Sequence, residues 1–148
     1  MRTILLDSAP LGLLSAPPSK TDTQACKAWL ATLVGGGARV IVPEITDNEL
    51  RRELVRARKA SSVRRLDLLA LSTEHLPLTT PLMRLAADLW AQARQAGQPT
   101  AGDNTIDADV ILAAQALNLG VSDFVIATTN VGHLSRFVPA EDWQTIAP

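Results

Sequence analysis

Three separated segments of the chain carry acidic side chains in settings where a carboxylate could do chemistry. Asp7 ends the apolar run RTILLD, Glu49 lies in PEITDNEL, and Asp109 immediately precedes VILAAQAL. Carboxylate oxygens are the ligands that Mg²⁺ prefers, and a hard divalent cation removes the repulsion between neighbouring carboxylates. If folding brings the three segments together, the sequence predicts a site for such a cation.

Two of these acids also have a simpler structural interpretation. Asp7 could cap the turn that follows its strand, and Thr46 and Glu49 have the T-x-x-E spacing of a capping box. The capping box is disfavoured if the helix already begins at Pro43, because Glu49 would then lie one to two turns inside it. Both interpretations stay open at this point.

Asp109 is the acid that capping explains least well. The segment after it is apolar on nearly every face except at Gln115, so the helix is expected to be buried. A carboxylate at the start of a buried helix should be hydrogen-bonded, paired or bound to a metal. Asp107 stands two residues earlier and also suits the positive end of the helix dipole. The two carboxylates do not share a helix face, so at most one would bind a metal from the helix.

A polar triplet follows the apolar run FVIA near the end of the chain. It comprises Thr128, Thr129 and Asn130. Short polar side chains in this position can form a turn or bind a ligand, and the turn is the commoner role. The triplet therefore counts toward a site only together with the three acids.

Segments typical of strands and of helices alternate along the chain. The sequence predicts strands at 2–7, 38–42, 75–78 and 124–127, a fifth at 143–146, and helices at 21–34, 43–59, 63–71, 81–96 and 106–119. This alternation predicts a parallel sheet of four to five strands with helices on both faces. Open sheets of this kind bind ligands at the carboxyl ends of their strands, where Asp7, Glu49 and Asn130 should lie.

The composition is typical of a soluble globular protein. The 148 residues suit a single domain spanning 1–148, with 47% apolar and 20% charged residues. Cys26 is the only cysteine, which excludes an internal disulfide and fits a reducing cytosol. No apolar run reaches the ~18 residues of a membrane span. We therefore expect a cytoplasmic protein that does not associate with membranes.

Half of the 14 Lys and Arg residues lie within fifteen positions that begin at Arg51, although the net charge is only −1. Arg51, Arg56 and Arg58 could follow the phosphate backbone of a nucleic acid. An ordinary solvent-exposed helix face explains the same pattern equally well. Arg51 and Arg52 come just after Glu49, so one of them could instead pair with an acid near the site.

At these residues the sequence resembles the PIN domain, and the resemblance covers almost the whole chain. It rests on LLDS, VPEITDNELRREL, DVILAAQAL and VIATTNVGHLSRF. It implies a three-layer α/β/α fold with strand order 3-2-1-4-5 and metal-dependent hydrolysis of phosphodiester bonds. Asp7, Glu49 and Asp109 would then be catalytic residues that bind Mg²⁺ or Mn²⁺, and Asn130 would assist as a fourth catalytic residue.

The match to the family's pattern is uneven. The family's third acid stands immediately before an I-A-A-like helical run, which fits Asp109 better than Asp107. Asn130 matches the fourth position of the family's pattern, and Thr128 matches a polar position two residues before it. Asn130 departs from the four-acid pattern, because its carbonyl oxygen can bind a metal or orient water but supplies no charge. A second metal ion would therefore be bound less firmly than in proteins with four acids.

Many similar bacterial proteins are toxins of toxin–antitoxin pairs that cut RNA. The resemblance thus implies a ribonuclease that acts on RNA and is inhibited by a small antitoxin protein, and it also implies a homodimer. Two alternatives remain: a DNA or flap-type nuclease with the same metal chemistry, and a non-catalytic PIN module that binds RNA or a partner protein.

Overall fold

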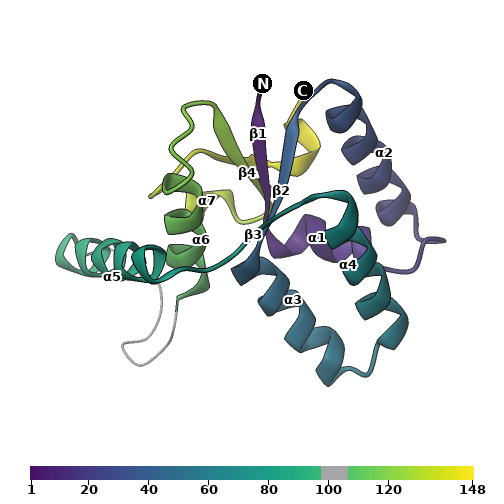
Figure 1. Ribbon diagram of the computed structural model, residues 1–148, viewed down its shortest axis with the longest axis horizontal. Coiled ribbons are helices and arrows are strands. Elements are labelled where there is room, and N and C mark those ends of the chain that lie inside the picture. Colours follow the sequence, from purple (N-terminus) through teal and green to yellow (C-terminus); the bar gives the residue numbers. More distant parts are fainter. Residues whose placement is uncertain (98–106) are drawn as a thin grey trace.

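The computed structural model describes residues 1–97 and 107–148, and its centre is one parallel sheet (Figure 1). Within those residues the strands are β1 (Thr3–Leu6), β2 (Arg39–Pro43), β3 (Glu74–Leu76), β4 (Phe124–Thr128) and β5 (Ala140–Asp142). Their order is β3-β2-β1-β4-β5, and every neighbouring pair is parallel. The predicted parallel sheet and its order 3-2-1-4-5 are confirmed.

Helices connect the strands in the way the alternation predicts. They are α1 (Ser8–Ser15), α2 (Thr21–Gly35), α3 (Glu44–Arg56), α4 (Ala60–Ser72), α5 (Thr80–Gln95), α6 (Ala108–Leu117), α7 (Val131–Leu134) and the 3₁₀ helix η1 (Trp143–Thr145). Position 106, where the last long helix was expected to begin, lies outside the described residues. None of the helices in the described part of the chain is long and apolar enough to span a bilayer.

Two elements differ from the sequence predictions. The fifth strand was placed at 143–146, but it is formed by 140–142, and η1 follows it. Helix α1 was not predicted at all. Its Pro10 stands in the first turn, where a missing backbone N–H removes no intrahelical bond.

Alternate residues of the strands pack on opposite faces of the sheet, as the period of a strand requires. Leu5, Ile41 and Ile126 pack with side chains of α5, α6 and α7. Ile4 and Val125 pack in a second cluster with side chains of α1, α2 and α4. Helices therefore cover both faces, which gives the expected three layers.

The carboxyl ends of the strands lie at the edge from which several helices start. Helix α1 begins directly after Asp7, α3 begins after Pro43, and α7 begins after Asn130. Figure 1 shows α3 and α4 projecting on one side of this edge and α5 on the other, with the two termini at the opposite end. Asp7, which precedes α1, lies at this edge, and α3, which carries Glu49, begins there.

Candidate active site

Asp7 is buried at the end of β1, and both of its carboxylate oxygens accept hydrogen bonds. Its Oδ1 accepts from the backbone N–H of Ser8 at 2.7 Å, which caps α1. Its Oδ2 accepts from the hydroxyl of Thr128 at 2.6 Å, and that hydroxyl accepts from the backbone N–H of Asn130 at 2.8 Å. The cap considered from the sequence is present, and a chain of hydrogen bonds also joins the ends of β1 and β4.

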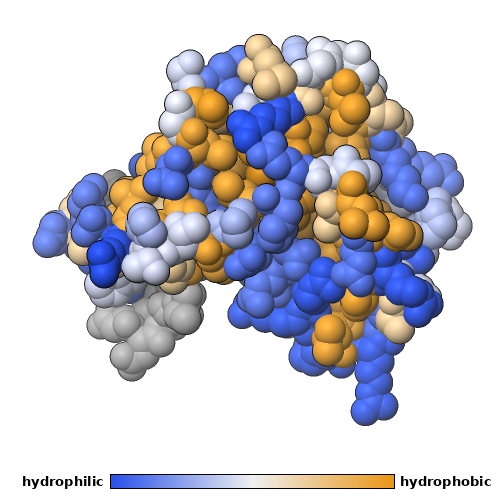
Figure 2. All heavy atoms as spheres, viewed as in Figure 1, coloured by the Kyte–Doolittle hydropathy of each residue, from blue (hydrophilic) through white to orange (hydrophobic). Residues whose placement is uncertain are grey.

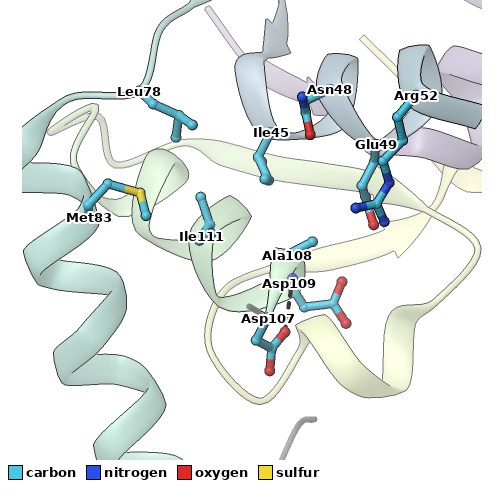
Figure 3. A pocket seen from close by; sticks show the side chains of 10 residues that line it. All are labelled: Ile45, Asn48, Glu49, Arg52, Leu78, Met83, Asp107, Ala108, Asp109 and Ile111. Carbon is cyan, nitrogen blue, oxygen red and sulfur yellow. Dashed lines mark hydrogen bonds between the residues drawn. The ribbon is translucent and has the colours of Figure 1, made fainter. Parts of the chain in front are cut away.

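Glu49 and Asp109 line one cavity of about 400 Å³ at the carboxyl edge of the sheet. Glu49 projects from α3 and Asp109 from the first turn of α6, and Figure 3 shows both carboxylates directed into the same space. Helix α3 begins at Glu44, so Glu49 lies inside the helix and does not cap it. Thr46 is buried and donates to the carbonyl of Pro43, so the T-x-x-E spacing is not a capping box here.

The surroundings of Glu49 disfavour its ionised form. Burial raises the pKa of Glu49 most, and the negative charges of Asp7 and Asp109 raise it further, with a smaller effect from Asp107. The guanidinium of Arg52 acts in the opposite direction on the pKa of Glu49 but does not outweigh these effects. These charge effects on Glu49 arise because carboxylates from three distant segments of the chain lie near one another.

The surroundings of Asp109 act in the same direction. Burial raises the pKa of Asp109 most, followed by the charges of Asp7 and Asp107, whereas His133 and Arg136 lower it. The Nδ1 of His133 lies 3.8 Å from Oδ2 of Asp109. The sequence showed that His133 follows Asn130 closely, but it gave no signal that His133 and Arg136 would approach Asp109.

Asp107 caps α6. Its Oδ1 accepts from the backbone N–H groups of Asp109 at 3.1 Å and Val110 at 3.4 Å. Its Oδ2 is buried and has no hydrogen-bond partner among the described residues. Figure 3 shows the carboxylate of Asp107 directed away from that of Asp109. A buried carboxylate oxygen without a partner is costly, and a cation or a water molecule would satisfy it.

Asn130 lies at the start of α7 and is exposed. Its side chain makes no capping hydrogen bond within the described ranges, while its backbone N–H is bonded to Thr128. The position of Asn130 is therefore tied to Asp7 through Thr128, and its exposed amide group can bind a ligand.

The arginines near the site have different surroundings. Arg51 donates to Asp47 at 2.9 Å on α3 and to Asp67 at 2.7 Å on α4, so it joins the two helices. Arg56 is paired with Glu53 on the exposed surface. Both guanidinium groups already have carboxylate partners, which leaves less of their charge available to a nucleic acid.

Arg52 lines the cavity beside Glu49 and is exposed. In residues 1–97 and 107–148 it makes no hydrogen bond or ion pair, although its charge acts on Glu49. Arg58 is also exposed, at the turn between α3 and α4, where hydrophilic residues cover much of the surface in Figure 2. Arg52 is thus a cation placed beside the acidic residues, whereas Arg58 is at the far end of α3.

No three acidic, histidine or cysteine side chains in the described ranges are gathered closely enough to hold a metal ion as they stand. The carboxylates share a neighbourhood and influence one another, but their side chains remain spread apart.

The sequence matches no protein-family model and no curated protein. Solved structures do match. One is VapBC2 from Rickettsia felis, bound to a DNA fragment from its promoter. It is 14% identical with a TM-score of 0.71, over 95% of this chain and 98% of that chain. VapBC-1 from nontypeable Haemophilus influenzae is 20% identical with a TM-score of 0.71, over 97% and 99%. DNA-bound VapBC from Salmonella typhimurium is 21% identical with a TM-score of 0.62, over 97% and 99%.

The chain has a PIN-like fold. These three structures are of VapBC toxin–antitoxin complexes, and the matches extend over nearly the full chain. At these identities the likeness concerns the fold. The roles of individual residues in the PIN-like domain must come from its own geometry.

The raised pKa values of Glu49 and Asp109 predict that these residues destabilise the metal-free protein at neutral pH. A carboxyl whose pKa is raised on folding contributes stability below its unfolded pKa, and this contribution is lost as the pH rises through the folded pKa. Glu49→Gln or Asp109→Asn should therefore increase the free energy of unfolding at pH 7, by about 0.5–2 kcal/mol. Urea denaturation at pH 7 and pH 4 measures this, and the gain should shrink at the lower pH.

Glu53→Gln is the matched control, because it removes the same charge one helical turn farther along α3. The pKa of Glu53 is lowered by its bond to Arg56, so this substitution should not stabilise the protein. If Glu49→Gln and Glu53→Gln change the free energy of unfolding equally, the carboxylates do not repel one another as described.

Proposed function

We propose that this chain is a metal-dependent endoribonuclease and the toxin of a toxin–antitoxin pair. The observation that carries the proposal is that Glu49 and Asp109 line one cavity at the carboxyl edge of a PIN-like sheet, with the charge of Asp7 acting on both. Grouped acids with raised pKa values, beside an open cavity, are typical of a functional site. The PIN-like fold makes phosphodiester hydrolysis the chemistry that such a group of acids suits best.

The donor set suits Mg²⁺ or Mn²⁺, since every candidate ligand atom is an oxygen. Asp7, Glu49 and Asp109 would hold the ion, partly through its water molecules, and Asn130 would assist through its carbonyl oxygen. The charges around Glu49 fit this set, because the negative charges of Asp7 and Asp109 act on it and the guanidinium of Arg52 does not outweigh them. Such an ion supplies Lewis acidity toward a phosphate oxygen and lowers the pKa of a bound water.

The side chains of the protein then have distinct tasks. Thr128 fixes the orientation of Asp7 by donating to its Oδ2. Glu49 or Asp109 would orient the attacking water, since both carboxylates line the cavity. Arg52 would bind a phosphate of the substrate at the rim of the cavity. No nucleophilic side chain is needed.

A small antitoxin protein is the partner that we propose. The support is the likeness to structures of VapBC toxin–antitoxin complexes over nearly the whole chain. A short reading frame for a DNA-binding protein immediately upstream of the gene would add to that support.

Removing one of the metal-binding acids should abolish cleavage. Asp7→Asn keeps the size of the side chain and an acceptor for the Ser8 N–H, so the fold should survive while the rate falls by roughly 10²–10³-fold or more. The measurement is cleavage of a labelled RNA in Mn²⁺, with circular dichroism to verify folding and Glu53→Gln as the control. A folded Asp7→Asn variant that cuts RNA at the wild-type rate would overturn the site. Cleavage of a matched DNA strand in preference to RNA would instead favour the DNA-nuclease alternative.

Arg52 should contribute more to RNA binding than the other arginines of α3. Arg52→Ala is expected to weaken binding and to lower the slope of log K against log salt by ~0.7, the value for one lost contact to a single-stranded phosphate. Arg56→Ala is the matched control, because Arg56 is paired with Glu53 and should change the slope less. Fluorescence anisotropy with a labelled RNA and the Asp7→Asn protein measures both. Equal slopes for the two variants would show that Arg52 has no special role.

A further inference from the structure

Gln115 is a completely buried glutamine on α6, and both ends of its side-chain amide are hydrogen-bonded. Its Oε1 accepts from the backbone N–H of Ile45 at 3.3 Å. Its Nε2 donates to the carbonyl of Leu76 at 2.8 Å and, more weakly, to that of Pro77 at 3.5 Å. This is the residue that interrupts the otherwise apolar segment VILAAQAL.

The groups bonded to Gln115 belong to two other elements at the carboxyl edge of the sheet. Ile45 stands in the first turn of α3, where backbone N–H groups have no partner within the helix. Pro43 precedes that turn and provides no side-chain cap. Leu76 ends β3 and pairs with Pro43 of β2. Gln115 therefore caps α3 from a neighbouring helix and ties that cap to the end of β3.

The same two helices carry the facing acids of the candidate site. Glu49 follows Ile45 by four residues, so the two share one face of α3 and line the same cavity. Asp109 lies on α6, six residues before Gln115. The carboxylates of Glu49 and Asp109 repel each other, and this repulsion tends to push α3 away from α6. The hydrogen bond from Ile45 to Gln115 joins the two helices directly and opposes that movement (Figure 3 shows the cavity between them).

We propose that Gln115 is a positioning residue for the metal site: through Ile45 and Leu76 it fixes α3 against α6, so that Glu49 and Asp109 reach one cation. This inference rests on the proposed function. An amide is well suited to the task, because it donates and accepts at once and carries no charge of its own into an acidic neighbourhood. A carboxylate would lose the donor, and an apolar side chain would leave the N–H of Ile45 and the carbonyl of Leu76 without partners.

The alternative is that Gln115 only satisfies buried backbone groups and stabilises the fold. Affinity for Mn²⁺, measured on folded protein by isothermal titration calorimetry, separates the two roles. Gln115→Met keeps the length of the side chain and removes both hydrogen-bonding ends. Leu33→Ala is the control, because Leu33 is completely buried in the cluster on the opposite face of the sheet, and its loss destabilises the protein without removing a hydrogen bond between α3 and α6.

We expect Gln115→Met to weaken Mn²⁺ binding by about 10- to 100-fold, the usual effect of losing a group that orients metal ligands. Leu33→Ala should leave the affinity within about twofold of the wild-type value. If Gln115→Met does not fold, Gln115→Glu replaces it, since that variant keeps an acceptor for Ile45 but, when ionised, cannot donate to Leu76; it should also weaken binding.

Wild-type affinity in the folded Gln115 variant would overturn the positioning role and leave the proposed function standing. An equal loss of affinity in Leu33→Ala would also overturn it, because loss of stability alone would then explain the effect. Failure of the wild-type protein to bind Mn²⁺ would contradict the proposed function itself, and the positioning role would fall with it.

Discussion

Repulsion among the carboxylates of Asp7, Glu49, Asp107 and Asp109 is the interaction on which the candidate site depends. Burial and the neighbouring negative charges raise the pKa of Glu49 and of Asp109, so the folded protein holds these groups at a cost. Local secondary structure does not require this unfavourable free energy, because helices can be capped without bringing acidic residues from three segments together. A divalent cation is the ligand that turns this repulsion into attraction, and this links the instability of the site to its proposed chemistry.

The fold withstands the repulsion because the elements that carry the acids are anchored elsewhere. The central strands are buried on both faces, with Leu5, Ile41 and Ile126 in one cluster and the alternate residues in the other. Asp7 is further restrained by its bonds to Ser8 and Thr128. The carboxylates of Glu49 and Asp109 make no such hydrogen bonds within residues 1–97 and 107–148, so these two side chains can adjust. The proposed nuclease function would require this combination of a rigid frame and adjustable side chains.

The sequence alone predicted the parallel sheet, its two-sided burial and the edge of the sheet at which Asp7 lies, because the central strands β1, β2 and β4 are apolar runs between helical segments. It did not predict α1, since Pro10 and Gly12 normally break helices, and the capping carboxylate of Asp7 and the first-turn position of Pro10 outweigh that tendency here. The fifth strand was misplaced because WQTI is partly apolar, whereas the residues that pair with β4 are the more polar 140–142. The bonds of Arg51 to Asp67 and of Gln115 to Ile45 depend on the packing of separate helices, which no local pattern in the sequence encodes.

An anomalous-scattering map from crystals of the protein soaked in Mn²⁺ tests the central claim most directly, because it locates the ion independently of any activity. We expect one strong peak in contact with the carboxylates of Asp7, Glu49 and Asp109, and no such peak in crystals of Asp109→Asn treated in the same way. Well-ordered side chains with no peak between them, or a peak only at another place on the molecule, would contradict the claim that these acids form a metal site.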